Sequence, residues 1–214
     1  MTTGSGNVVT ENRTVDNFTG LDVSSSFDVE VKIGSPSSVR VEADDNIIKY
    51  IVTKVSGNEL TIRVENGHSI SNAHMKVFVT VPSLKEIDAS ASADVKVLGT
   101  ITGDGELKFT ATSSADIEAE VDAPEITVKA NSSGSVTLKG KTKNYKADAS
   151  SSADIKTGDL LSENADVKVS SSGSVHVYAS VKLDADASSS GDIIYSGAAK
   201  VNKNVSSSGS VEQK

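Results

Sequence analysis

The chain has 214 residues, enough for one large all-β domain or two small ones with a real core, and 36% of them are hydrophobic but only 4% aromatic. The core must therefore be built from Val, Ile, Leu and Ala, without large rings. A net charge of -8 without a basic cluster argues against a nucleic-acid partner, and the lack of cysteine excludes disulfides and zinc–thiolate sites.

No apolar run approaches the ~20 residues that cross a bilayer, so no membrane span is expected. Residues 1–4 also lack the basic and then apolar start of a signal peptide.

Residues 1–82 are predicted to form a β region with longer strands than the rest of the chain. Alternating strands with turn signals between them are expected at residues 27–33, 38–42, 59–64 and 75–81. Residues 44–51 could form one short helix with acidic residues at its start. Residues 24–29 are an early copy of the phrase that repeats later, so this region could consist of coils with longer excursions. The boundary is placed near Pro82, although residues 1–82 and 83–214 could also form one continuous domain.

Residues 83–214 repeat a short polar phrase, Ser-Ser-(Ala/Gly)-(Asp/Ser), that ends on an aliphatic residue. The aliphatic anchors are Val95, Ile117, Val136, Ile155, Val175, Ile193 and Val211. They are separated by 22, 19, 19, 20, 18 and 18 residues. This period predicts a single-stranded parallel β-helix of ~19-residue coils, for which right-handed coils are expected. A turn of two units, about 38 residues, is disfavoured because such small residues could not fill its cross-section.

Strict alternation within each unit indicates which side chains face the core. It predicts that Ile155 is buried between Val136 and Val175. It also places a serine inward four residues before each anchor and Ala or Gly inward two residues before it. The serine hydroxyls would then stack ~4.8 Å apart inside the solenoid, at a corner where small residues let the chain bend. Connectors such as residues 139–144 and 157–159 would close each coil.

Four stretches together carry a family resemblance: residues 4–11, 18–23 and 41–46, and the serial Ser-Ser units. With them the chain resembles the putative auto-transporter adhesin, head GIN domain family over nearly its whole length. The resemblance implies an exported Bacteroidetes protein of the cell surface, periplasm or outer membrane, often made with a lipoprotein signal, and no catalytic residues.

Two acidic residues are the candidates for chemistry. Asp94 and Asp116 occupy equivalent places on neighbouring coils, so they could stand ~5 Å apart, which suits a calcium site or a retaining glycosidase pair. The favoured interpretation is instead that both acids only aid solubility and that Lys96 and Lys108 balance their charge. The three histidines lack metal-ligand spacing and are expected at the surface, and no cofactor is expected.

The remaining candidate is an outward strip of small polar side chains, which could bind a glycan or another envelope polymer weakly at many points. Its residues are Ser114, Ser133, Ser152, Asp154, Ser172, Ser190 and Asp192. The sequence thus predicts a non-enzymatic, adhesin-like surface module. The alternatives are a polysaccharide-degrading β-helix enzyme and a purely structural envelope spacer.

Overall fold

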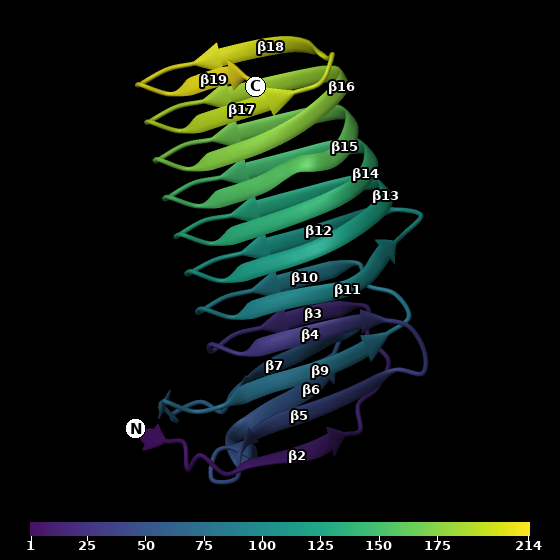
Figure 1. Cartoon of the computed structure of the whole chain (residues 1–214), viewed down its shortest axis with the longest axis vertical. Helices are drawn as coiled ribbons and strands as arrows, with labels where there is room; N and C mark the ends of the chain where they lie inside the picture. Colours follow the sequence, from purple (N-terminus) through teal and green to yellow (C-terminus); the bar gives the residue numbers. More distant parts are fainter.

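The computed structural model describes residues 1–214 and consists almost entirely of β-strands stacked into one elongated solenoid (Figure 1). The strands of the first half are β1 (Thr2–Thr3), β2 (Val8–Arg13), β3 (Gly20–Val23), β4 (Asp28–Ile33), β5 (Ser38–Asp44), β6 (Ile51–Ser56), β7 (Glu59–Val64), β8 (Ile70–Ser71), β9 (Met75–Val81) and β10 (Glu86–Ala89). Those of the second half are β11 (Asp94–Thr102), β12 (Glu106–Ala111), β13 (Asp116–Ala130), β14 (Ser135–Ala149), β15 (Asp154–Val169), β16 (Ser174–Ala187), β17 (Asp192–Ser196), β18 (Lys200–Val205) and β19 (Ser210–Gln213). The 3-10 turn η1 (Ile48–Tyr50) is the only helical element.

The parallel β-helix with single-unit coils is confirmed by the strand register. Ile155 pairs with Val136 on the coil before it and with Val175 on the coil after it, and its side chain is fully buried. The same ladder continues through the other anchors up to Val211. Each strand therefore stacks on the equivalent strand one unit away, which rules out the 38-residue turn.

The prediction that a serine faces inward before each anchor is wrong, because these serines lie in a sharp exposed turn. Ser151 and Ser152 both have positive φ angles, 53° and 62°, and both are exposed. The backbone N–H of Ala153 donates to the carbonyl of Ser150 at 3.1 Å, so these four residues form a tight turn with both central residues left-handed. Alternation cannot hold through such a turn, because two successive side chains point outward.

The turns are bonded to one another along the solenoid. The N–H of Ser133 donates to the carbonyl of Ser151 at 3.0 Å, and the N–H of Ser152 donates to that of Ser171 at the same distance. A left-handed conformation costs roughly 1–2 kcal/mol in a residue with a side chain, and this ladder of turn hydrogen bonds helps to offset it. The small residue after each turn stays inward as predicted, since Ala153 is buried.

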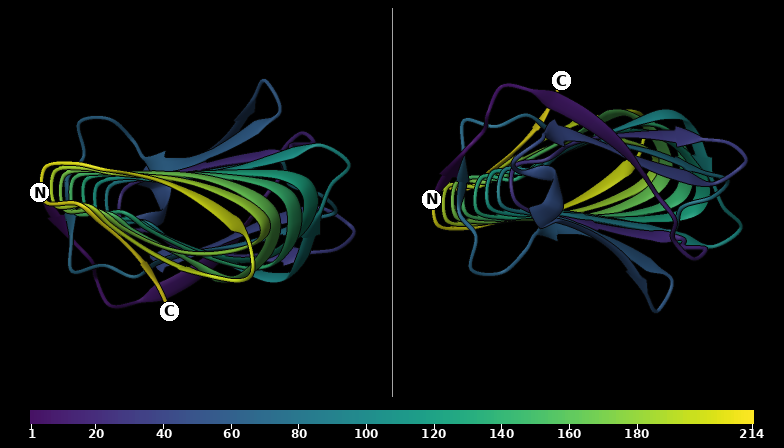
Figure 2. Two further views of the ribbon diagram at one scale, coloured as in Figure 1. Left: turned by 90° about the horizontal axis from the view of Figure 1, so that it is seen from above. Right: turned by 90° about the horizontal axis from the view of Figure 1, so that it is seen from below.

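In the four coils built from β13 to β16 the opposite side has no turn, contrary to the prediction that residues 139–144 and 157–159 close it. Both segments lie inside continuous strands, β14 and β15, of 15 and 16 residues. These strands bend around a rounded edge and join the two flat faces of the solenoid, which is visible end-on in Figure 2. Residues 157–159 sit at a register shift between neighbouring strands, so they form a bulge in one face.

The N-terminal region contributes one coil with a long excursion, as the early copy of the phrase suggested. β3 and β4 pair in parallel with β10 and β11, and Val29 lies in the anchor ladder beside Val95. Between β4 and β10 the chain descends through β5 and β6, which run antiparallel to β9 and β7. β7 and β9 then return in parallel with β3 and β4. The sheet is thus continuous past Pro82.

The short helix expected at residues 44–51 is a single 3-10 turn. Ile47, Ile48 and Ile51 are buried beneath it, so the turn closes the end of the core (Figure 2, right). The acidic residues do not cap it. Instead the buried carboxylate of Asp44 accepts hydrogen bonds from the N–H groups of Gly6 and His74, each at 2.7 Å, and so ties the N-terminal segment to this end.

Candidate functional site

The structure places the predicted polar strip on the sharp edge of the solenoid. Each of its serines is the second of the two central residues of a turn, and its backbone N–H group is used in the turn ladder. Asp154 and Asp192 follow the turns at the first positions of β15 and β17. The strip therefore forms a narrow convex ridge, seen at the left of Figure 1, rather than a hollow.

Asp94 and Asp116 are brought together as direct partners in the β11–β13 register. Asp28 pairs with Asp94 on its other side, so three carboxylates follow one another on successive coils. Partial burial and then the charges of Asp28 and Asp116 raise the pKa of Asp94 above its ordinary value, and Lys96 opposes them. Lys108, the other proposed counter-charge, pairs with Glu106 instead, at 3.6 Å. No group of three or more acidic, His or Cys side chains has a geometry that could hold a metal ion.

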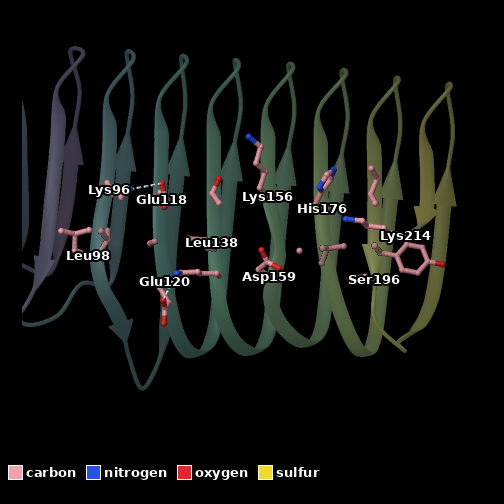
Figure 3. Close-up of a pocket in the computed structure, with 18 of the residues that line it drawn as sticks. Lys96, Leu98, Glu118, Glu120, Leu138, Lys156, Asp159, His176, Ser196 and Lys214 are labelled. Atoms are coloured by element: carbon pink, nitrogen blue, oxygen red, sulfur yellow. Dashed lines mark ion pairs between the residues drawn. The ribbon is translucent and has the colours of Figure 1, made fainter.

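A groove that the sequence did not predict lies on one flat face of the solenoid. It occupies about 730 Å³ on the flat face made by β11, the first parts of β13 to β16, and β17. Figure 3 shows its side chains in two rows that run along the solenoid axis, across the strands. Lys96, Glu118, Lys156 and His176 stand in one row, and the other runs from Leu98 through Asp159 to Lys214.

Ion pairs between outward side chains of neighbouring coils line the groove. Lys96 pairs with Glu118 at 3.8 Å and Lys139 pairs with Glu120 at 3.2 Å. Hydrogen bonds from Thr100 and Lys139, and the lysine charge, hold the pKa of Glu120 below its ordinary value. Glu120 is thus an ionised ion-pair partner at neutral pH.

Bulges in β11 and β15 lie at the groove. The β11–β13 register shifts between Lys96 and Thr100, and the β15–β16 register shifts between Thr157 and Leu161. Bulges are common beside functional sites because they redirect side chains and locally end the regular pairing. The units that contain these two shifts are the longest in the repeat, at 22 and 20 residues. Units longer than 19 residues were therefore the feature of the sequence that could have indicated the groove.

Polar contacts also cross the core below the groove. The Tyr145 hydroxyl lies 2.8 Å from the Thr157 hydroxyl, which donates to the carbonyl of His176 at 2.8 Å. Both side chains are buried, and burial raises the pKa of Tyr145 far above its ordinary value. This bridge fixes the bulge of β15 against the opposite face of the coil and thereby supports the groove wall at His176.

Comparison with known proteins agrees with this architecture. Residues 17–199 match the family described as "Putative auto-transporter adhesin, head GIN domain". The chain belongs to this family. No curated protein matches the chain, and no helix in it is long and apolar enough to cross a membrane.

Several solved structures of family-like proteins share the fold. A putative adhesin from Bacteroides fragilis superposes with a TM-score of 0.91 at 20% identity, covering 100% of this chain and 99% of the other. A putative adhesin from Parabacteroides merdae has a TM-score of 0.82 at 20% identity, with 100% and 98% covered. A putative lipid binding protein from Parabacteroides distasonis has a TM-score of 0.75 at 23% identity, with 100% and 99% covered. These likenesses show the fold of the chain as a whole.

Proposed function

We propose that this family member is a non-enzymatic, adhesin-like module of the bacterial envelope or cell surface, and that its groove binds an extended polymer such as a glycan. The observation that carries the proposal is the direction of the groove. Its two rows of outward side chains run across at least six strands, parallel to the solenoid axis. Successive coils are spaced by ~4.8 Å, so a polymer of repeating units lying along the axis meets a new pair of side chains at each coil.

Such a site gains its strength from repetition. Each exposed side chain in the groove contributes little alone, since surface polar contacts are worth roughly 0–1 kcal/mol. A polymer that engages several coils at once, on several copies of the module, converts these weak contacts into strong retention. This behaviour suits an adhesin.

The chemistry of the groove acids favours binding over catalysis. A glycosidase needs one carboxyl whose pKa is raised so that it stays protonated and can act as an acid. Glu120 has the opposite perturbation, and Glu118 faces Lys96. The lipid binding described for the Parabacteroides distasonis protein is not carried over, because a continuous core of 55 buried residues fills the interior of this solenoid.

A glycan array probed with multivalent protein tests the proposal. Lys156→Ala/His176→Ala removes two exposed groove side chains from neighbouring coils and should weaken retention strongly, because the loss is repeated in every copy that the polymer engages. Lys168→Ala, an exposed lysine of the same β15 strand beyond the bend, is the matched control and should bind normally.

A third variant separates the groove from the serine strip. Ser133→Ala/Ser152→Ala/Ser172→Ala removes three turn hydroxyls and should leave binding intact. If this variant loses binding while the groove variant keeps it, the strip is the site and the groove proposal is wrong. If the wild-type protein retains no glycan or envelope polymer at all, the module is a spacer.

A further inference from the structure

The last coil carries polar side chains at positions that face the core. Lys203 of β18 pairs in register with Ala185, which is buried. The same column is apolar on the coils beneath it: Ile87, Phe109, Val128, Ala147, Val167 and Ala185. On β19, Gln213 stands opposite Tyr195, which is also buried. The repeat thus changes character at this coil.

Lys203 crosses the open mouth of the solenoid. Its ammonium donates to the carbonyl of Val211 at 3.0 Å and lies 4.9 Å from the centre of the Tyr195 ring. The methylene stem of a lysine in this position covers apolar surface while the charge reaches a polar partner. β18 and β19 have strand partners on one side only, β16 and β17, so their outer edges carry free backbone groups.

The N-terminal end has the same arrangement on a different edge strand. Glu11 and Arg13 of β2 stand opposite Val41 and Val39, whose side chains are buried. Arg13 pairs with Glu11 at 2.8 Å and donates to the carbonyls of Ile48 and Ile51 at 3.1 and 3.2 Å. A cation therefore reaches across each end of the core to backbone carbonyls on the far side.

We propose that the two ends of the solenoid are latent interfaces for a second copy of this chain, held closed by Lys203 at one end and by Glu11 and Arg13 at the other. An exposed strand edge pairs readily with another edge, and inward-pointing charges are a known defence against such pairing. A second copy stacked on β18 and β19 would bury the Lys203 ammonium between two apolar cores, away from water. The wild-type module therefore does not associate through its ends.

Replacing Lys203 tests this inference directly. Lys203→Val restores the apolar column, so two copies should pair through their β18 and β19 edges by a two-fold axis. The mass measured by light scattering after size exclusion should rise with concentration from that of the 22.1 kDa chain to twice that value. Assembly of the Lys203→Val variant should stop at the dimer, because its N-terminal end stays closed. Lys203→Arg, which keeps the charge, and Lys168→Val, which removes an exposed lysine elsewhere, should leave the mass unchanged.

The second end is tested by adding Glu11→Val and Arg13→Val to Lys203→Val. Assemblies larger than a dimer are then expected, because contacts between unlike ends do not close. Lys203→Met, which keeps the length of the stem, replaces Lys203→Val if circular dichroism shows the valine variant to be unfolded. Folded Lys203→Val or Lys203→Met protein whose mass equals that of the wild type at all concentrations overturns the inference. A triple variant that stops at the dimer overturns the part that concerns β2.

Discussion

Replacing Ile155 with alanine should destabilise the protein by roughly 2–5 kcal/mol. The side chain is fully buried and lies in register between Val136 and Val175. The substitution removes three methyl or methylene groups, and each is worth about 0.8 kcal/mol when buried, which gives about 2.4 kcal/mol from transfer alone. The cavity adds to this, because the hydrogen-bonded coils on either side hold the neighbouring anchors apart and limit collapse.

Urea unfolding followed by circular dichroism measures this loss, with thermal melting as a second probe. For a protein of this size, a 1 kcal/mol loss lowers the melting temperature by roughly 2–4 °C, so a fall of roughly 4–20 °C is expected. Lys168→Ala, exposed on the same strand, should change stability by less than about 0.5 kcal/mol. A loss below about 0.5 kcal/mol for Ile155→Ala would refute the assignment of the inward face. Mutants must also unfold in one transition, since a solenoid can lose its coils in stages.

Three further predictions concern the turns and the acidic columns. Ser151→Val should lower the free energy of unfolding by roughly 1–3 kcal/mol, because a β-branched residue fits poorly at φ 53°. Ser151→Gly should be neutral or slightly stabilising, because glycine adopts this conformation readily. Equal stabilities of the two variants would contradict the left-handed turn. Burial raises the pKa of Asp88, and the charges of Asp22 and Glu86 raise it further. The native state therefore binds the proton of Asp88 more tightly than the unfolded chain does. The stabilisation that this proton gives is lost as the pH rises through the raised pKa. Asp88→Asn should therefore raise the melting temperature at about pH 7 but not at about pH 3, and a gain of equal size at both would argue against this cause. Millimolar calcium should leave the melting temperature unchanged, and Asp116→Ser should be neutral or slightly stabilising; a calcium-induced rise that this substitution abolishes would show a metal bridge to Asp94.

The straight parts of the fold could be predicted because two periods coincide in them. Alternation along a strand identifies the inward face, and the repeat of about 19 residues stacks like positions on one another, so Ile155 was placed correctly from sequence alone. The turns could not be predicted in the same way. A left-handed backbone costs Ser and Ala roughly 1–2 kcal/mol, so nothing in a Ser-Ser pair indicates that two successive residues leave the alternation.

The N-terminal end and the groove show two other limits. Residues 44–51 have the acidic start and aliphatic spacing of a helix, but tertiary contacts override this local preference: Asp44 is used to hold Gly6 and His74, and the isoleucines close the core. The groove depends on where the extra residues of a long unit are placed. The length of a unit shows that it contains additional residues. Which face of the solenoid those residues distort depends on the register of the neighbouring strand, which the sequence does not show.

Inward and outward positions of this solenoid are under different packing constraints, so side chains on its surface can be changed without disturbing the core. Inward positions are constrained by coils only ~4.8 Å apart, so a change of one residue is felt by the coils on both sides. At Gly134 a side-chain carbon would lie 2.2 Å from the carbonyl oxygen of Ala111, which shows how little room the stack leaves. Outward positions beside the same strands, such as Lys156 and His176, have no such constraint. The side chains of the groove can therefore be exchanged, and with them the polymer specificity proposed for it, while the ladder that includes Ile155 stays the same.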